Sequence, residues 1–207
     1  MHYKKQMAAL TLAGILAAAA PGSARAASEG DWPCVQPLVP TISAATMWEE
    51  PPLDPARADE WKSDQKISQL VQRLALRRVS MDEASSLIAE YARPLNDAER
   101  LEKIPLVFQG LLQTVNKERS AIIDSIGRFT RAQRGRADEI RKNRAALIAL
   151  QASASDENKR AEIQEAIDWQ TRIHRDREKS LEYVCESPTL LEQRVFQIAR
   201  ELQTQLP

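Results

Sequence analysis

The chain has 207 residues, of which 43% are hydrophobic, 28% are charged and 5% are aromatic, and its formal net charge is zero. Balanced charge argues against a general binder of nucleic acids or other polyanions. Few glycines and many Ala, Leu, Arg, Glu and Gln residues favour helix, so we predict an all-α protein.

The first 26 residues have the three parts of a secretory signal peptide. Lys4 and Lys5 form a basic start, residues 7–20 are apolar, and residues 24–26 (Ala-Arg-Ala) form a cleavage site. The apolar run is too short to cross a bilayer, which takes about 20 residues. We therefore predict that residues 1–26 are removed. The mature chain would be periplasmic, with a formal charge of −3 and no transmembrane segment.

Residues 27–58 are predicted to form an irregular strap rather than a helix. The prolines that exclude continuous helix are Pro33, Pro37, Pro40, Pro51, Pro52 and Pro55. Trp32 and Trp48 are large apolar side chains that suit packing against helices. The alternative is a proline-rich ligand for a recognition domain, which would seldom carry such tryptophans together with a cysteine.

Two cysteines, Cys34 and Cys185, lie far apart in the sequence. In an oxidising compartment such a pair favours a disulfide, which would join the strap to the distant part of the chain. A redox centre is the less favoured alternative, because it usually has closely spaced cysteines. Two free thiols are the remaining alternative.

Residues 59–207 are predicted to form a single helical domain. The first helix is expected at about 59–78, where apolar residues recur at spacings of three and four. Ser80 with Glu83 has the pattern of a capping box and predicts the start of a second helix, and Asn96 with Glu99 predicts the start of a third. Pro105 is expected to kink or divide that third helix.

A long heptad pattern follows, and it predicts a coiled-coil-like helical hairpin. Its apolar positions are Leu112, Ile126, Ile140 and Leu147, and Phe108, Val115, Ile122, Phe129 and Leu150; Arg119, Gln133, Arg136 and Asn143 interrupt them. The turn is expected at residues 153–156, with Ser155 or Asp156 as N-cap. A return helix would run to about Cys185, with a seam of Ile163, Ile167, Gln170, His174, Arg177, Leu181 and Val184.

Because a short turn makes neighbouring helices antiparallel, we expect an antiparallel arm at about residues 124–185 that projects from a helical body. Ser187 and Pro188 have the pattern of an N-cap followed by proline. They predict a separate last helix that packs on the body.

No catalytic, metal-binding or cofactor-binding motif is found in the sequence. His174 is the only histidine of the expected mature chain, and a metal site needs several ligands. We therefore expect no catalytic residue, no metal and no cofactor.

One group of residues suggests a binding site. Seven arginines come level with each other when the hairpin is folded: Arg128, Arg131, Arg134, Arg136, Arg172, Arg175 and Arg177. Gly127 comes directly before the first of them, and Gly135 lies between Arg134 and Arg136. Clustered like charges destabilise a helix, and arginine suits carboxylate and phosphate, so the cluster is a candidate anion-binding or partner-binding site. The alternative is a solvated face neutralised by nearby carboxylates.

The segment Asp31-Trp32-Pro33-Cys34-Val35-Gln36, with Val39-Pro40, Trp48 and Pro51-Pro52 after it, resembles a group of exported helical proteins of proteobacteria. The resemblance implies a periplasmic location in a Gram-negative cell and implies no activity.

These observations favour a non-enzymatic, periplasmic protein-interaction factor, such as an adaptor, a tether or a holdase, whose partner is an unknown periplasmic protein. The first alternative is a binder of a small anionic ligand at the arginine cluster, and the next is an enzyme of unrecognised type. Arg136 and Asn143 would equally suit a homodimer formed through the arms. Nucleic acid is not an expected partner.

Overall fold

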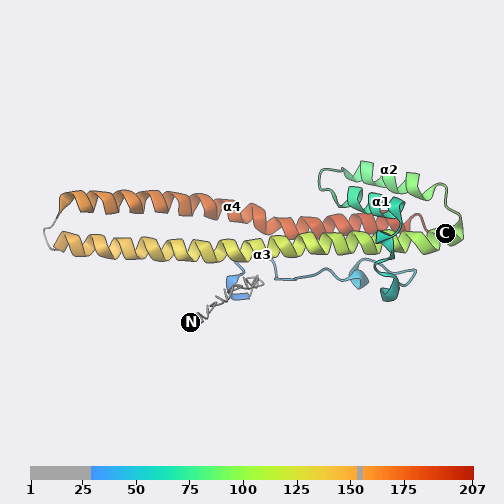
Figure 1. The fold of residues 1–207 in the computed structure, drawn as a ribbon, viewed down its shortest axis with the longest axis horizontal. Helices are drawn as coiled ribbons and strands as arrows, with labels where there is room; N and C mark the ends of the chain where they lie inside the picture. Colours follow the sequence, from blue (N-terminus) through green and yellow to red (C-terminus); the bar gives the residue numbers. More distant parts are fainter. Residues whose placement is uncertain (1–28, 153–155) are drawn as a thin grey trace, which may run out of the picture.

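The computed structural model describes residues 29–152 and 156–207 and shows an elongated molecule (Figure 1). Within these residues every regular element is a helix, which confirms the predicted all-α fold. The predicted signal peptide at residues 1–26 lies outside the described residues, as does most of the expected hairpin turn.

Two short helices and two long ones make up most of the described chain. They are α1 (Gln65–Ala75), α2 (Met81–Ala92), α3 (Asp97–Ala152) and α4 (Glu157–Gln203), and short 3-10 turns occur at Glu29–Asp31, Ala44–Thr46, Pro55–Arg57 and Glu60–Lys62. The first α-helix begins at residue 65 rather than at about 59, because the Asp64 carboxylate accepts hydrogen bonds from the amides of Lys66 and Ile67.

Helix starts follow the capping patterns of the sequence. The Ser80 hydroxyl accepts from the Glu83 amide at 3.2 Å, while the Glu83 carboxylate pairs with Arg73 at 3.0 Å. The box before α3 is reciprocal: the Asn96 side chain accepts from the Glu99 amide at 3.0 Å, and Glu99 accepts from the Asn96 amide at 3.1 Å. The amide of Asn96 also lowers the pKa of Glu99.

Both long helices continue through a proline, which corrects two expectations. Pro105 does not divide α3, and Pro188 lies inside α4 instead of opening a separate last helix. Each proline removes a hydrogen bond to the carbonyl four residues earlier. Those carbonyls belong to Leu101 and Val184, and the two prolines are themselves buried.

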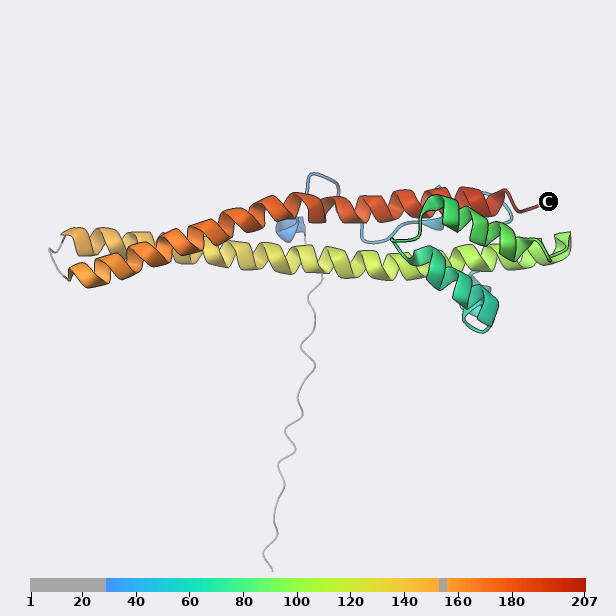
Figure 2. The same ribbon diagram turned by 90° about the horizontal axis from the view of Figure 1, so that it is seen from above.

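The hydrophobic core lies in the body at the end of the molecule that carries α1 and α2 (Figures 1 and 2). It joins α1 and α2 to the first third of α3 and the last third of α4. The strap also contributes to this core, because the buried Trp48 ring stacks on Phe108 with centroids 4.6 Å apart.

The strap runs along α3 as irregular chain, as predicted. Polar side chains of α3 bind its backbone: the Asn116 amide accepts from the Ile42 N–H at 2.8 Å and donates to the Ile42 carbonyl at 3.0 Å. Gln109 donates to the Asp54 carbonyl at 3.0 Å. Cys34 forms the predicted disulfide with Cys185, with Cα atoms 5.5 Å apart, so the strap is also covalently joined to α4.

Beyond the body, α3 and α4 form the predicted antiparallel arm (Figure 1). The two views show the helices crossing gently along the arm (Figures 1 and 2). Asp156 caps the start of α4 by accepting from the amides of Asn158 and Lys159. From residue 124 to residue 152 the arm extends over about 40 Å, at 1.5 Å per residue.

Candidate functional site on the hairpin arm

The interior of the arm is partly polar, and several of its polar side chains pair within the chain. The Gln133 amide donates to the His174 carbonyl at 3.1 Å and accepts from Arg136 at 2.6 Å. Asn143 donates to Gln170 at 3.2 Å. These pairs account for interruptions of the heptad pattern without a second copy of the chain.

The predicted seam and the observed one diverge toward the body. Arg177 is exposed and Val184 is 41% exposed, so neither belongs to the interface, and the buried positions are Cys185 and Pro188 instead. In a straight helix, positions seven residues apart rotate by about 20° around the helix axis relative to each other. Over the length of α4, residues at strict seven-residue spacing therefore turn away from α3.

Arg119 also interrupts the heptad pattern, and it lies in the body rather than in the arm. Its side chain is buried, donates to the Val39 carbonyl of the strap and lies 3.8 Å from the Glu192 carboxylate. Burial lowers the pKa of Arg119, and Glu192 partly opposes that effect.

Two arginines of the predicted cluster hold the start of the strap. The Arg131 and Arg134 guanidinium groups lie 2.5 Å and 3.0 Å from the Asp31 carboxylate. Asp31 therefore neutralises part of the cluster, which was not predicted from the sequence. The predicted disulfide could have indicated it, because Asp31 is close to Cys34 in the sequence and the disulfide holds Cys34 beside the arm.

The remaining arginines of the cluster have separate environments. Arg128 donates to the Ser125 hydroxyl at 2.7 Å, and Arg172 lies over the Trp169 ring at 5.1 Å from its centroid. Arg175 and Arg177 are exposed. The seven predicted residues therefore do not surround one common site.

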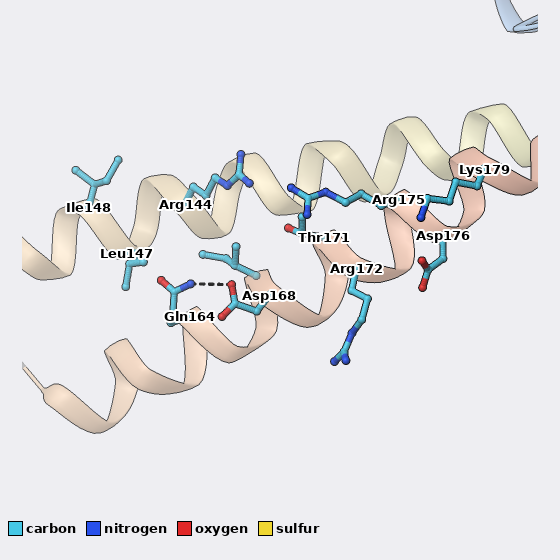
Figure 3. Close-up of a pocket in the computed structure, with 11 residues that line it drawn as sticks. Arg144, Leu147, Ile148, Gln164, Asp168, Thr171, Arg172, Arg175, Asp176 and Lys179 are labelled. Atoms are coloured by element: carbon cyan, nitrogen blue, oxygen red, sulfur yellow. Dashed lines mark hydrogen bonds between the residues drawn. The ribbon is translucent and has the colours of Figure 1, made fainter.

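The arm carries a groove of about 720 Å³ between α3 and α4, nearer the tip than most of the predicted cluster (Figure 3). It is lined by Arg144, Leu147, Ile148, Gln164, Ile167, Asp168, Thr171, Arg172, Arg175, Asp176 and Lys179. Arg172 and Arg175 belong to the predicted cluster, whereas Arg144, Thr171 and Lys179 were not predicted from the sequence.

The outer surface of the arm exposes large apolar side chains. Trp169 is 57% exposed and Ile148 is 66% exposed. The Trp169 ring is held by the guanidinium of Arg172, one turn later on α4. Ala161, Gln164 and Glu165 line a second shallow pocket beside this pair.

Among the described residues no group of three or more His, Cys, Asp or Glu side chains could hold a metal ion. No helix of the described chain is long and apolar enough to cross a membrane. No protein-family model, curated protein or solved structure matches this chain.

Proposed function

We propose that this chain is a non-enzymatic interaction protein of the periplasm that binds another protein through its hairpin arm. The observation that carries the proposal is the exposed Trp169 on the arm, with Arg172 stacked on it. The periplasmic location rests on the predicted signal peptide, and a disulfide suits that oxidising compartment.

The arm contributes little to the hydrophobic core of the body. The core cluster takes no buried residue from the arm at 124–185. The apolar residues buried within the described part of the arm are Ile126, Ile140, Ile167 and Cys185. An arm of about 40 Å with so few buried apolar residues extends the surface of the molecule and contributes little to the free energy of folding.

Trp and Arg are the residue types most enriched among interface residues that dominate binding energy. An exposed tryptophan on a helix presents a large apolar area to solvent, and burial of that area would favour association. Arg172 restricts the ring, which lowers the entropy lost on binding. The Trp169–Arg172 pair is therefore the expected centre of the docking surface.

Site-specific photo-crosslinking tests the proposal in periplasmic extract of the native cell. A photo-reactive phenylalanine analogue replaces Glu165, which lines the pocket beside Trp169 and Arg172, in the otherwise natural protein and in variants of it. Trp169→Ala should reduce capture of the partner by at least about tenfold, as expected for an interface residue worth about 2 kcal/mol. Tyr183→Ala is the matched control, because Tyr183 is a 74% exposed aromatic residue on the same helix near the disulfide.

Different results lead to different conclusions. One dominant partner that depends on Trp169 and not on Tyr183 would indicate an adaptor or tether, and many weakly captured proteins would indicate a holdase. Unchanged capture with Trp169→Ala would overturn the proposed docking surface.

A further inference from the structure

We propose that the groove between α3 and α4 on the arm binds a small anionic amphiphile, with its anionic group held between Arg144 and Arg175. The anion site at Arg144 and Arg175 differs from the proposed protein-docking surface, which is centred on Trp169. Both the groove and the pocket beside Trp169 are nevertheless lined by Gln164, Asp168 and Arg172. The class of ligand is a single-chain molecule with a phosphate or carboxylate head and a short apolar tail.

Two guanidinium groups from different helices converge in the groove. Arg144 extends from α3 and Arg175 from α4, and the two side chains point toward one another above Thr171 (Figure 3). Within the described residues neither arginine takes part in an ion pair or a side-chain hydrogen bond. Two converging, unpaired guanidinium groups favour an anion that accepts from both.

The charges around this point leave an excess of positive charge. Lys179 adds a third cation, and Asp168 and Asp176 are the carboxylates of the groove. Both carboxylates keep their negative charge, and Arg144, Arg175 and Lys179 exceed them by one positive charge. The Asp176 side chain points away from the two guanidinium groups (Figure 3). The fourth cation, Arg172, also lines the groove, but its side chain points away from Arg144 and Arg175 (Figure 3). Its guanidinium lies over the Trp169 ring.

An unpaired hydroxyl lies beside the two arginines, and among the described residues α4 has other unpaired polar atoms at Arg160 and His174. The Thr171 Oγ1 atom is buried and has no hydrogen-bond partner among the described residues. Buried hydroxyl groups are nearly always paired. Thr171 lines the groove beside the end of Arg175 (Figure 3), and an anionic oxygen that displaces the covering side chains could accept from its hydroxyl.

The end of the groove nearer the tip is apolar, which suits the tail of the ligand. Leu147 and Ile148 of α3 and Ile167 of α4 line it, and Ile148 is 66% exposed. A short alkyl chain here would remove that apolar surface from water while the head stays at the arginines. The groove therefore has a cationic part and an apolar part in the order that an anionic amphiphile needs.

Isothermal titration calorimetry of the mature protein with octyl phosphate below its micelle concentration tests the inference. Inorganic phosphate, which lacks the tail, and octyl glucoside, which lacks the charge, are the comparison ligands. We expect saturable binding of octyl phosphate at one site per chain, weaker binding of phosphate and no binding of octyl glucoside.

Variants identify the site. Arg175→Gln and Arg144→Gln should each weaken octyl phosphate binding by roughly tenfold or more, because each removes a charge-assisted hydrogen bond. Ile148→Ser should weaken octyl phosphate and leave phosphate unchanged. Arg128→Gln is the control, since Arg128 binds Ser125 outside the groove and should leave octyl phosphate binding unchanged.

Three results would overturn the inference: no saturable binding of octyl phosphate, equal binding by Arg175→Gln and the unmodified protein, or equal binding of octyl glucoside. Co-sedimentation with vesicles of an anionic phospholipid, without saturable octyl phosphate binding, would instead indicate a membrane surface and would also overturn it. Partner capture through Trp169 is measured separately, so either proposal can fail alone.

Discussion

Two glycines of α3 have opposite surroundings, and they give a matched test of packing at the residue scale. A Cβ atom at Gly110 would lie 2.7 Å from Trp61 Cδ2 and 2.9 Å from Val71 Cγ2, whereas a Cβ at Gly135 would have no atom within 4 Å. Gly110 therefore allows the Trp61 ring to lie against the helix backbone. Gly135 has no such packing role among the described residues.

We predict that Gly110→Ala lowers the free energy of unfolding by about 1–3 kcal/mol, because overpacking outweighs the gain in helix propensity. Gly135→Ala should raise it by about 0.5–1 kcal/mol through that propensity alone. Urea unfolding followed by circular dichroism measures both. Equal stability of the two variants would contradict the close packing of Trp61 on Gly110.

At the scale of elements, the strap takes the place that a neighbouring helix would have on α3. Gln109, Gln113 and Asn116 lie on one face of that helix and bind strap carbonyls or amides. Irregular chain cannot satisfy its own backbone groups, so these side chains satisfy them instead. Burial of Trp48 then adds apolar area to the same contact.

Asn116 makes the two hydrogen bonds that fix Ile42, so its removal should loosen the strap. We predict that Asn116→Ala lowers the free energy of unfolding by about 1–3 kcal/mol, because the partly buried backbone groups of Ile42 lose their partners. Ser120→Ala is the control, since its hydrogen bond to Pro40 is long at 3.5 Å and exposed, and it should change stability by less than about 0.5 kcal/mol. Thermal unfolding of the two variants side by side would reveal the difference, and equal midpoints would argue against this contact.

Helix starts could be predicted from the sequence, whereas the unbroken course of α4 through its proline could not. Ser80 and Asn96 marked helix starts correctly, because capping depends on residues that are close in sequence. Pro188 misled the prediction of a separate last helix, since tertiary packing of the proline ring keeps α4 continuous. The groove was missed because Arg144, Thr171 and Arg175 come together only after the two helices are set in register.

On the scale of the whole molecule, the strap, the body and the arm are connected by one covalent cross-link. We predict that replacing Cys34 and Cys185 together by serine lowers the free energy of unfolding by about 2–5 kcal/mol, because the disulfide closes a loop with a sequence separation of 151 residues. The same variant should become sensitive to thermolysin at residues 35–40, where Val35 is 99% exposed. Cleavage within α1 or α2 instead would mean that the disulfide supports the body rather than the start of the strap.

The position of that disulfide also determines how the molecule would respond to mechanical tension. Force applied between Glu29 and Pro207 passes through the covalent bond from Cys34 to Cys185, so the chain between these cysteines cannot be extended from its ends while the bond is intact. Only the short segments outside the loop can then be pulled out, to roughly 100 Å at full extension, compared with roughly 600 Å after reduction. The arm is thus mechanically isolated from the chain ends, and it can keep its folded form while the last turns of α4 are stretched.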